Sequence, residues 1–118
     1  IVFAEKHGVD PKTNITFQQV RNDGLPIDLG ARVWPNTERL KAAAALYELE
    51  GKDPKPVFEQ STKVLMERYL AGPTPGLWIE KFNADGQPTS NIVPTSTFYH
   101  VFLAFSEVLR VMENMVEG

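Results

Sequence analysis

The 118-residue sequence contains no cysteine, which excludes disulfide bonds and thiolate metal sites and fits a cytoplasmic protein. It has no cluster of Lys and Arg, and its formal net charge of −3 argues against a nucleic-acid partner. No apolar run approaches the roughly 18–20 residues of a membrane span, so a membrane partner is not expected either. A Gly-rich phosphate loop and a nucleophile elbow are also missing.

Histidine is scarce as well. His7 and His100 do not have the spacing of metal ligands, so we expect no metal site. His7 is predicted to be a surface residue that complements the negative end of a short helix over residues 1–7, which Gly8 ends. Because this helix begins without an initiator Met or a capping residue, we expect the chain to be the C-terminal piece of a longer protein.

Apolar residues at helical spacing predict three longer helices, at residues 34–50, 53–70 and 95–117. Gly51 marks the end of the first. Leu40, Ala43 and Ala44 share one face of that helix, and the small alanines would let another helix approach closely. Residues 98–105 are apolar around most of the circumference of the last helix, which predicts that this part is buried on several sides.

Two short hairpins are predicted between the helices. Residues 15–20 and 25–29 flank a tight turn at residues 22–24, and residues 77–82 and 87–90 flank a second turn. In the strand at 77–82, we predict that Trp78 and Glu80 lie on opposite faces and that Glu80 is solvated. Helix pairs whose connecting loops carry hairpins favour an all-α fold, a slice of a toroid of helical hairpins.

Trp34 and Glu38 are four residues apart at a helix start, so both side chains can face one space. An indole ring beside a carboxylate is a common way to hold a sugar, with the apolar face of the sugar on the ring and its hydroxyls on the acid. The alternative is that Glu38 interacts only with the helix dipole while Trp34 packs beneath it.

His100 stands near the start of an otherwise apolar helix. The pKa of a free imidazole lies nearest neutrality among side chains, so histidine is the usual residue for moving protons at neutral pH. A pocket with aromatic walls would suit such chemistry on a small uncharged substrate. The alternative is a core histidine whose ring is hydrogen-bonded to a neighbour.

Four segments together resemble the N-acylglucosamine 2-epimerase family, in particular its mannose isomerase or mannose-6-phosphate isomerase branch. They are residues 32–42 (RVWPNTERLKA), 76–80 (GLWIE), 85–86 (DG) and 96–101 (STFYHV). Each motif is weak alone, whereas their order and spacing are specific, and the similarity covers essentially the whole chain. The resemblance implies that residues 1–118 form the C-terminal part of an (α/α)6 barrel.

The resemblance also implies site residues. Trp34 and Glu38 match the family's Trp-x-x-x-Glu segment at the sugar pocket, and His100 matches its C-terminal catalytic histidine. Arg32 and Trp78 are expected to bind substrate. Where the epimerase branch has a Trp five residues before this histidine, the chain has Thr95, which favours a monosaccharide isomerase. The family's second catalytic histidine, in a His-x-x-Glu helix, and its N-terminal arginine are expected upstream of this chain.

We therefore expect a sugar isomerase or 2-epimerase that moves a proton at C2 of an open-chain, mannose-type aldose through an enediol. His100 and Glu38 are the expected catalytic residues, the partner is a small monosaccharide, and no cofactor is required. Self-association, for example as a homodimer, is also expected. Two alternatives remain, namely a non-catalytic carbohydrate-binding relic and a glycoside hydrolase, which would need a second carboxylate beside Glu38. The 118-residue piece alone is expected to be inactive.

Overall fold

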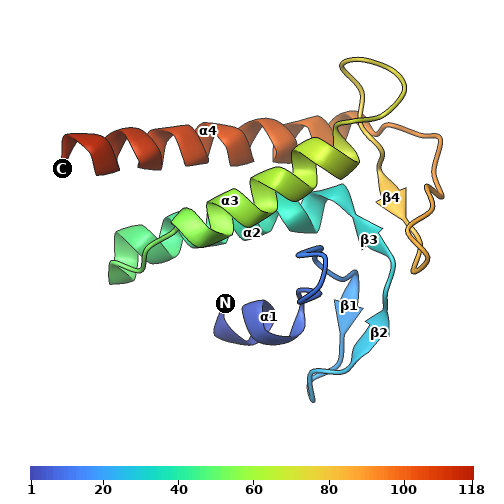
Figure 1. The fold of residues 1–118 in the computed structure, drawn as a ribbon, viewed down its shortest axis with the longest axis horizontal. Helices are drawn as coiled ribbons and strands as arrows, with labels where there is room; N and C mark the ends of the chain where they lie inside the picture. Colours follow the sequence, from blue (N-terminus) through green and yellow to red (C-terminus); the bar gives the residue numbers. More distant parts are fainter.

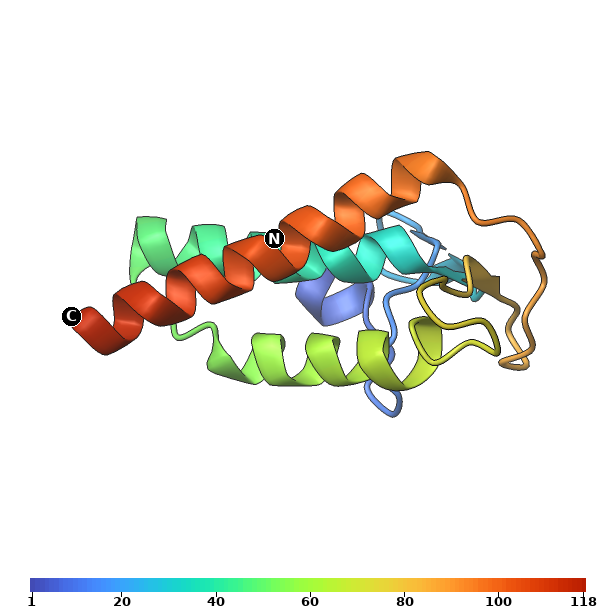
Figure 2. The same ribbon diagram turned by 90° about the horizontal axis from the view of Figure 1, so that it is seen from above.

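Three helical segments dominate the fold and lie side by side in the computed structural model, which describes residues 1–118 (Figure 1). They are α2 (Val33–Glu50), α3 (Lys55–Val64) with its π-helical extension η1 (Leu65–Tyr69), and α4 (Thr95–Glu117). Figures 1 and 2 show that α2 and α4 begin at the same end of the molecule, whereas α3 runs in the opposite direction. The first turns of α2 and α4 are therefore neighbours.

The helix boundaries follow local sequence signals. Gly51 ends α2 in the left-handed conformation (φ 69°), as predicted, and its N–H donates to the carbonyl of Tyr47 at 2.9 Å. The helix predicted over residues 53–70 begins slightly later than expected, with Pro54 at the N-cap position, and the Asp53 side chain accepts the N–H of Lys55. Its last turn is a π-helix, which the apolar spacing does not distinguish from a regular α-helix.

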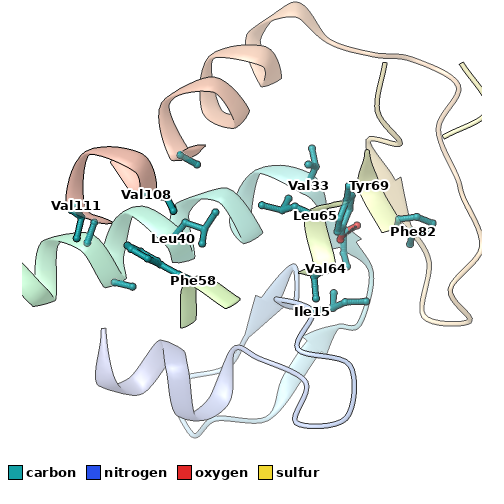
Figure 3. Packing of buried hydrophobic residues seen from close by; sticks show 14 residues of the cluster. Ile15, Val33, Leu40, Phe58, Val64, Leu65, Tyr69, Phe82, Val108 and Val111 are labelled. Carbon is teal, nitrogen blue, oxygen red and sulfur yellow. Dashed lines mark hydrogen bonds between the residues drawn. The ribbon is translucent and has the colours of Figure 1, made fainter. Parts of the chain in front are cut away.

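The hydrophobic core lies between these helices (Figure 3). The predicted face of α2 is buried, with Leu40 fully inaccessible and Ala43 and Ala44 nearly so. Helix α4 packs along α2, and α3 packs on α2 as well. The other helices contribute Phe58, Val64, Leu65, Tyr69, Ala104, Val108 and Val111.

The prediction that residues 98–105 are buried on several sides is wrong for this chain. Phe98, Tyr99 and Phe102 expose 55%, 57% and 58% of their surface. The physical reason is that α4 packs chiefly on α2, and a single neighbouring helix covers only one face. That covered face carries Thr97 and Ala104 in the first half of α4.

The first predicted hairpin is confirmed in shortened form. Strand β1 (Gln19–Val20) pairs antiparallel with β2 (Pro26–Asp28) around the predicted turn. The chain before this hairpin forms α1 (Val2–His7), which lies beneath α2 in Figure 1.

The second predicted hairpin has a different main partner. Strand β4 (Lys81–Phe82) pairs antiparallel with β3 (Ala31–Arg32), and only a single bridge, between Phe82 and Pro88, joins it to the expected return strand. Since β3 leads directly into α2, this pairing places the loop before β4 against the start of α2.

None of the helices combines the length and the apolar character that a membrane crossing needs.

Candidate active site

His100 and Glu38 form a hydrogen-bonded pair near the starts of α4 and α2. His100 Nδ1 lies 2.7 Å from Glu38 Oε1, although the two residues are 62 positions apart in the chain. The pair forms because α2 and α4 start at the same end of the molecule and pack against each other. The side chains are 32% and 37% exposed, so His100 is not a fully buried core histidine.

The carboxylate partner determines which ring nitrogen carries the proton. A carboxylate oxygen accepts hydrogen bonds, so Nδ1 of His100 donates its N–H to Glu38. In the neutral ring, Nε2 is then the nitrogen with the free lone pair. This arrangement leaves the Nε2 lone pair free to accept a proton or a hydrogen bond.

Trp34 supplies an aromatic wall beside this pair. Its ring centroid lies 5.9 Å from that of His100, with a tilt of 40° between the planes. Trp34 precedes Glu38 by one helical turn, so the structure brings Trp34, Glu38 and His100 together at one place, as the sequence spacing and the family resemblance imply.

Lys41 and Tyr99 complete the cluster and were not identified from the sequence. Lys41 Nζ lies 2.7 Å from Glu38 Oε1, the same oxygen that accepts the His100 hydrogen bond, and 5.8 Å from the centre of the Tyr99 ring. The Tyr99 ring meets His100 edge-on at 5.1 Å. The i,i+3 spacing of Glu38 and Lys41 was a usable signal for the ion pair. Nothing in the sequence indicates the placement of the Tyr99 ring.

Trp34 and Glu38 also line a small cavity of about 210 Å³ between α1 and α2. Its other walls include Ala4, Pro35 and Thr16. The hydroxyl oxygen of Thr16 is buried without a hydrogen-bond partner. His100 is not among the residues that line this cavity.

Trp78 lies apart from this cluster. It lines a different cavity, of about 370 Å³, with residues such as Pro73 and Val93. Its indole N–H donates to Glu80 Oε2 at 3.0 Å, and Glu80 is buried, with 7% of its surface exposed. The predictions that Trp78 and Glu80 lie on opposite faces and that Glu80 is solvated are therefore wrong. Residues two apart in an extended chain point to the same side.

Arg32 is exposed in β3, at the N-cap position of α2. Its backbone carbonyl accepts the Asn36 side-chain N–H, and its strand pairs with Lys81. Substrate binding by Arg32 and Trp78 stays a prediction.

The other histidine has a packing role. His7 is half-buried and not on the open surface as predicted: its ring lies 4.8 Å from that of Phe3 and fills the space beside Gly24. A Cβ on Gly24 would come within 2.3 Å of the His7 ring, so this turn requires glycine. No group of three or more His, Asp or Glu side chains in the structure is arranged to hold a metal ion.

Solved structures of sugar-converting enzymes share this fold. Cellobiose 2-epimerase from Spirochaeta thermophila matches 94% of the chain with a TM-score of 0.82 and 20% identity, and D-mannose isomerase matches 92% with a TM-score of 0.79 and 22% identity. The chain covers 30% and 28% of those two proteins. The fold is therefore that of a part of an (α/α)6 barrel, as expected.

A curated relative supports the same assignment at higher identity. The chain is 34% identical over 114 residues to "Mannose-6-phosphate isomerase" of Rhizobium meliloti (strain 1021), and this match spans 94% of the chain and 30% of that relative. The family model described as N-acylglucosamine 2-epimerase (GlcNAc 2-epimerase) matches residues 1–104. On this evidence, the chain belongs to the N-acylglucosamine 2-epimerase family.

Proposed function

We propose that this protein interconverts monosaccharides by moving a proton at C2 of an open-chain, mannose-type aldose. The observation that carries the proposal is the 2.7 Å hydrogen bond between His100 Nδ1 and Glu38 Oε1, which leaves Nε2 as a base in a family of sugar epimerases and isomerases. The mannose-type substrate is suggested by two of the similar proteins, which are named for mannose or its 6-phosphate.

In this proposal, Nε2 of His100 takes the proton from C2 of the aldose. The electron pair of the C2–H bond forms the C1–C2 double bond, and the carbonyl electrons move to O1, giving an enediolate. Return of the proton to C1, with transfer of the O2 proton to O1, gives the ketose. Return to the opposite face of C2 gives the epimer and needs a second acid. Glu38 stabilises the charge on His100 throughout, and the reaction requires neither a metal nor a redox cofactor.

The surroundings of the pair suit a sugar. The Trp34 ring, whose centre lies 5.9 Å from that of His100, offers a flat apolar surface to the C–H face of a hexose, and the part-exposed Glu38 carboxylate can accept hydrogen bonds from its hydroxyls.

Isotope exchange tests the proposed function. The full-length protein is incubated with D-mannose in D2O, and deuterium at C2 of mannose or C1 of fructose is followed by NMR. We expect deuterium incorporation together with conversion, because the proton on Nε2 exchanges with solvent. Hexose binding by calorimetry without any exchange would instead support the carbohydrate-binding alternative, and release of a reducing sugar from a glycoside would support a hydrolase.

Glu38→Gln is expected to lower kcat by roughly 10²-fold, the scale of losing one preorganised electrostatic partner. The amide is uncharged, so it does not stabilise the imidazolium, and it also releases Lys41 from its ion pair. Initial rates on mannose measure the effect. Glu48→Gln is the matched control, because it makes the same change on the same helix at an exposed ion pair with Arg110. Equal rates for the two variants would contradict the role of Glu38.

A further inference from the structure

Glu80 is a buried carboxyl group that the proposed reaction does not use. Its two side-chain oxygens have different partners: Oε2 accepts the indole N–H of Trp78 at 3.0 Å, and Oε1 accepts the hydroxyl of Thr97 at 3.3 Å. Its backbone carbonyl accepts the N–H of Val33 at 3.0 Å. One residue therefore contacts the loop before β4, the first turn of α4 and the first residue of α2.

Both helices that Glu80 contacts carry one member of the catalytic pair. Thr97 lies one turn before His100 on α4, and Val33 lies little more than one turn before Glu38 on α2. A shift of either helix start would change the distance between His100 Nδ1 and Glu38 Oε1 directly.

The Thr97–Glu80 hydrogen bond is the buried polar contact in the first turn of α4, one turn before the part-exposed His100–Glu38 pair. Phe98, Tyr99 and Phe102 are more than half exposed, whereas Thr97 is 5% exposed and is the only buried residue of α4 before Ala104. At the start of α2, the Val33 N–H is one of the first-turn donors that have no partner inside their own helix. Glu80 supplies an acceptor at both places.

We propose that Glu80 is a positioning residue for the His100–Glu38 pair. It rests on the proposed function and extends it: the Glu80 carboxyl holds the first turn of α4 through Thr97 while the Glu80 backbone carbonyl bonds the first residue of α2, so that His100 Nε2 is presented at a fixed place to the sugar. Catalysis by a positioned base is sensitive to such placement, since a displacement of about 1 Å can cost about 10²-fold in rate.

Three variants of the full-length protein test this role. Glu80→Ala removes both side-chain hydrogen bonds, and we expect it to lower kcat by about 10–10²-fold. Thr97→Val removes one of these bonds while keeping the side-chain shape, and we expect it to lower kcat by about tenfold. In both variants KM should change less than about threefold. Glu80→Gln is expected to retain kcat, because its carbonyl can accept from Trp78 and its amide can donate to Thr97. The NMR signal of the His100 Nδ1 proton should weaken in the first two variants and persist in the third.

Val111→Ala is the control for a merely structural effect. Val111 is fully buried on the same helix, far from His100, so its truncation destabilises the fold without touching the start of α4. Rates are compared per folded molecule. An equal loss of kcat in Val111→Ala, or no loss in Thr97→Val, would overturn the positioning role. If Glu80→Ala does not fold, Thr97→Val and Glu80→Gln decide the question.

The outcome is separable from the proposed function through His100→Asn. If that variant is inactive while Glu80→Ala and Thr97→Val keep normal kcat, the positioning role fails and the proposed function stands. If His100→Asn keeps normal activity, the proposed function itself fails.

Discussion

Replacing His100 with Asn is expected to lower kcat for mannose conversion by about 10²–10⁴-fold, the usual contribution of a general acid–base group. The Asn amide can fill part of the same space and can still donate a hydrogen bond toward Glu38, but it does not take a proton from carbon. Because the His100 side chain is 32% exposed, we expect little loss of stability. Deuterium exchange at C2 should fall by the same factor as turnover, since both begin with the same proton transfer.

His7→Asn provides the matched control, because His7 is the only other histidine of the chain. It packs on Phe3 and Gly24, so its replacement should lower the melting temperature and leave kcat per folded molecule unchanged. A His100→Asn variant with near-normal exchange would contradict the proposal. The double variant His100→Asn/Glu38→Gln should be no slower than His100→Asn alone, because the two residues act as one unit.

Replacing Asn36 with Leu is expected to lower the free energy of unfolding by about 3 kcal/mol, since it leaves buried polar groups without partners. Asn36 is 1% exposed; its Oδ1 accepts the N–H of Thr16 at 3.0 Å, and its Nδ2 donates to the Arg32 carbonyl and the Tyr69 hydroxyl at 2.9 and 3.2 Å. It therefore connects the N-terminal loop, the start of α2 and η1. Burial raises the pKa of the Tyr69 phenol far above its ordinary value, so Tyr69 stays protonated and donates to the Ala31 carbonyl.

Urea denaturation followed by circular dichroism measures the loss in Asn36→Leu. The same substitution at the exposed Asn91 serves as the control and should change the free energy of unfolding by no more than about 0.5 kcal/mol. A loss in Asn36→Leu as small as that of the control would show that the buried network is relaxed or solvated in solution. Because Asn36 lies between Trp34 and Glu38, a large loss would also indicate that the site rests on a rigid support.

Local sequence signals were sufficient for the helices. Gly51 terminates α2 because a left-handed residue ends a helix whatever its tertiary surroundings, and the spacing of Leu40, Ala43 and Ala44 defines a face without reference to the rest of the chain. The start of α4 was predicted near Thr95, and the structure begins the helix at Thr95, after Pro94 with its extended backbone.

Long-range partners were beyond the reach of these signals. The pairing of β4 with β3 joins segments separated by more than one helix, and the alternating pattern at residues 77–82 does not specify which strand it meets. The burial of Glu80 follows from that pairing. The exposure of Phe98 and Phe102 likewise depends on how many helices surround α4. The hydrophobicity of the sequence does not predict that number.

By itself, the sequence determined the helices, the family resemblance and the short list that contains Trp34, Glu38 and His100. Only the tertiary structure decided that His100 Nδ1 hydrogen-bonds to Glu38, and that Lys41 pairs with the same Glu38 oxygen. It also decided that Glu80 hydrogen-bonds to Thr97 on α4 and to Val33 on α2. The physical reason is distance along the chain. Helical periodicity and capping act within a few residues, whereas the site joins residues 62 positions apart, which only the packing of α4 on α2 brings within hydrogen-bond distance.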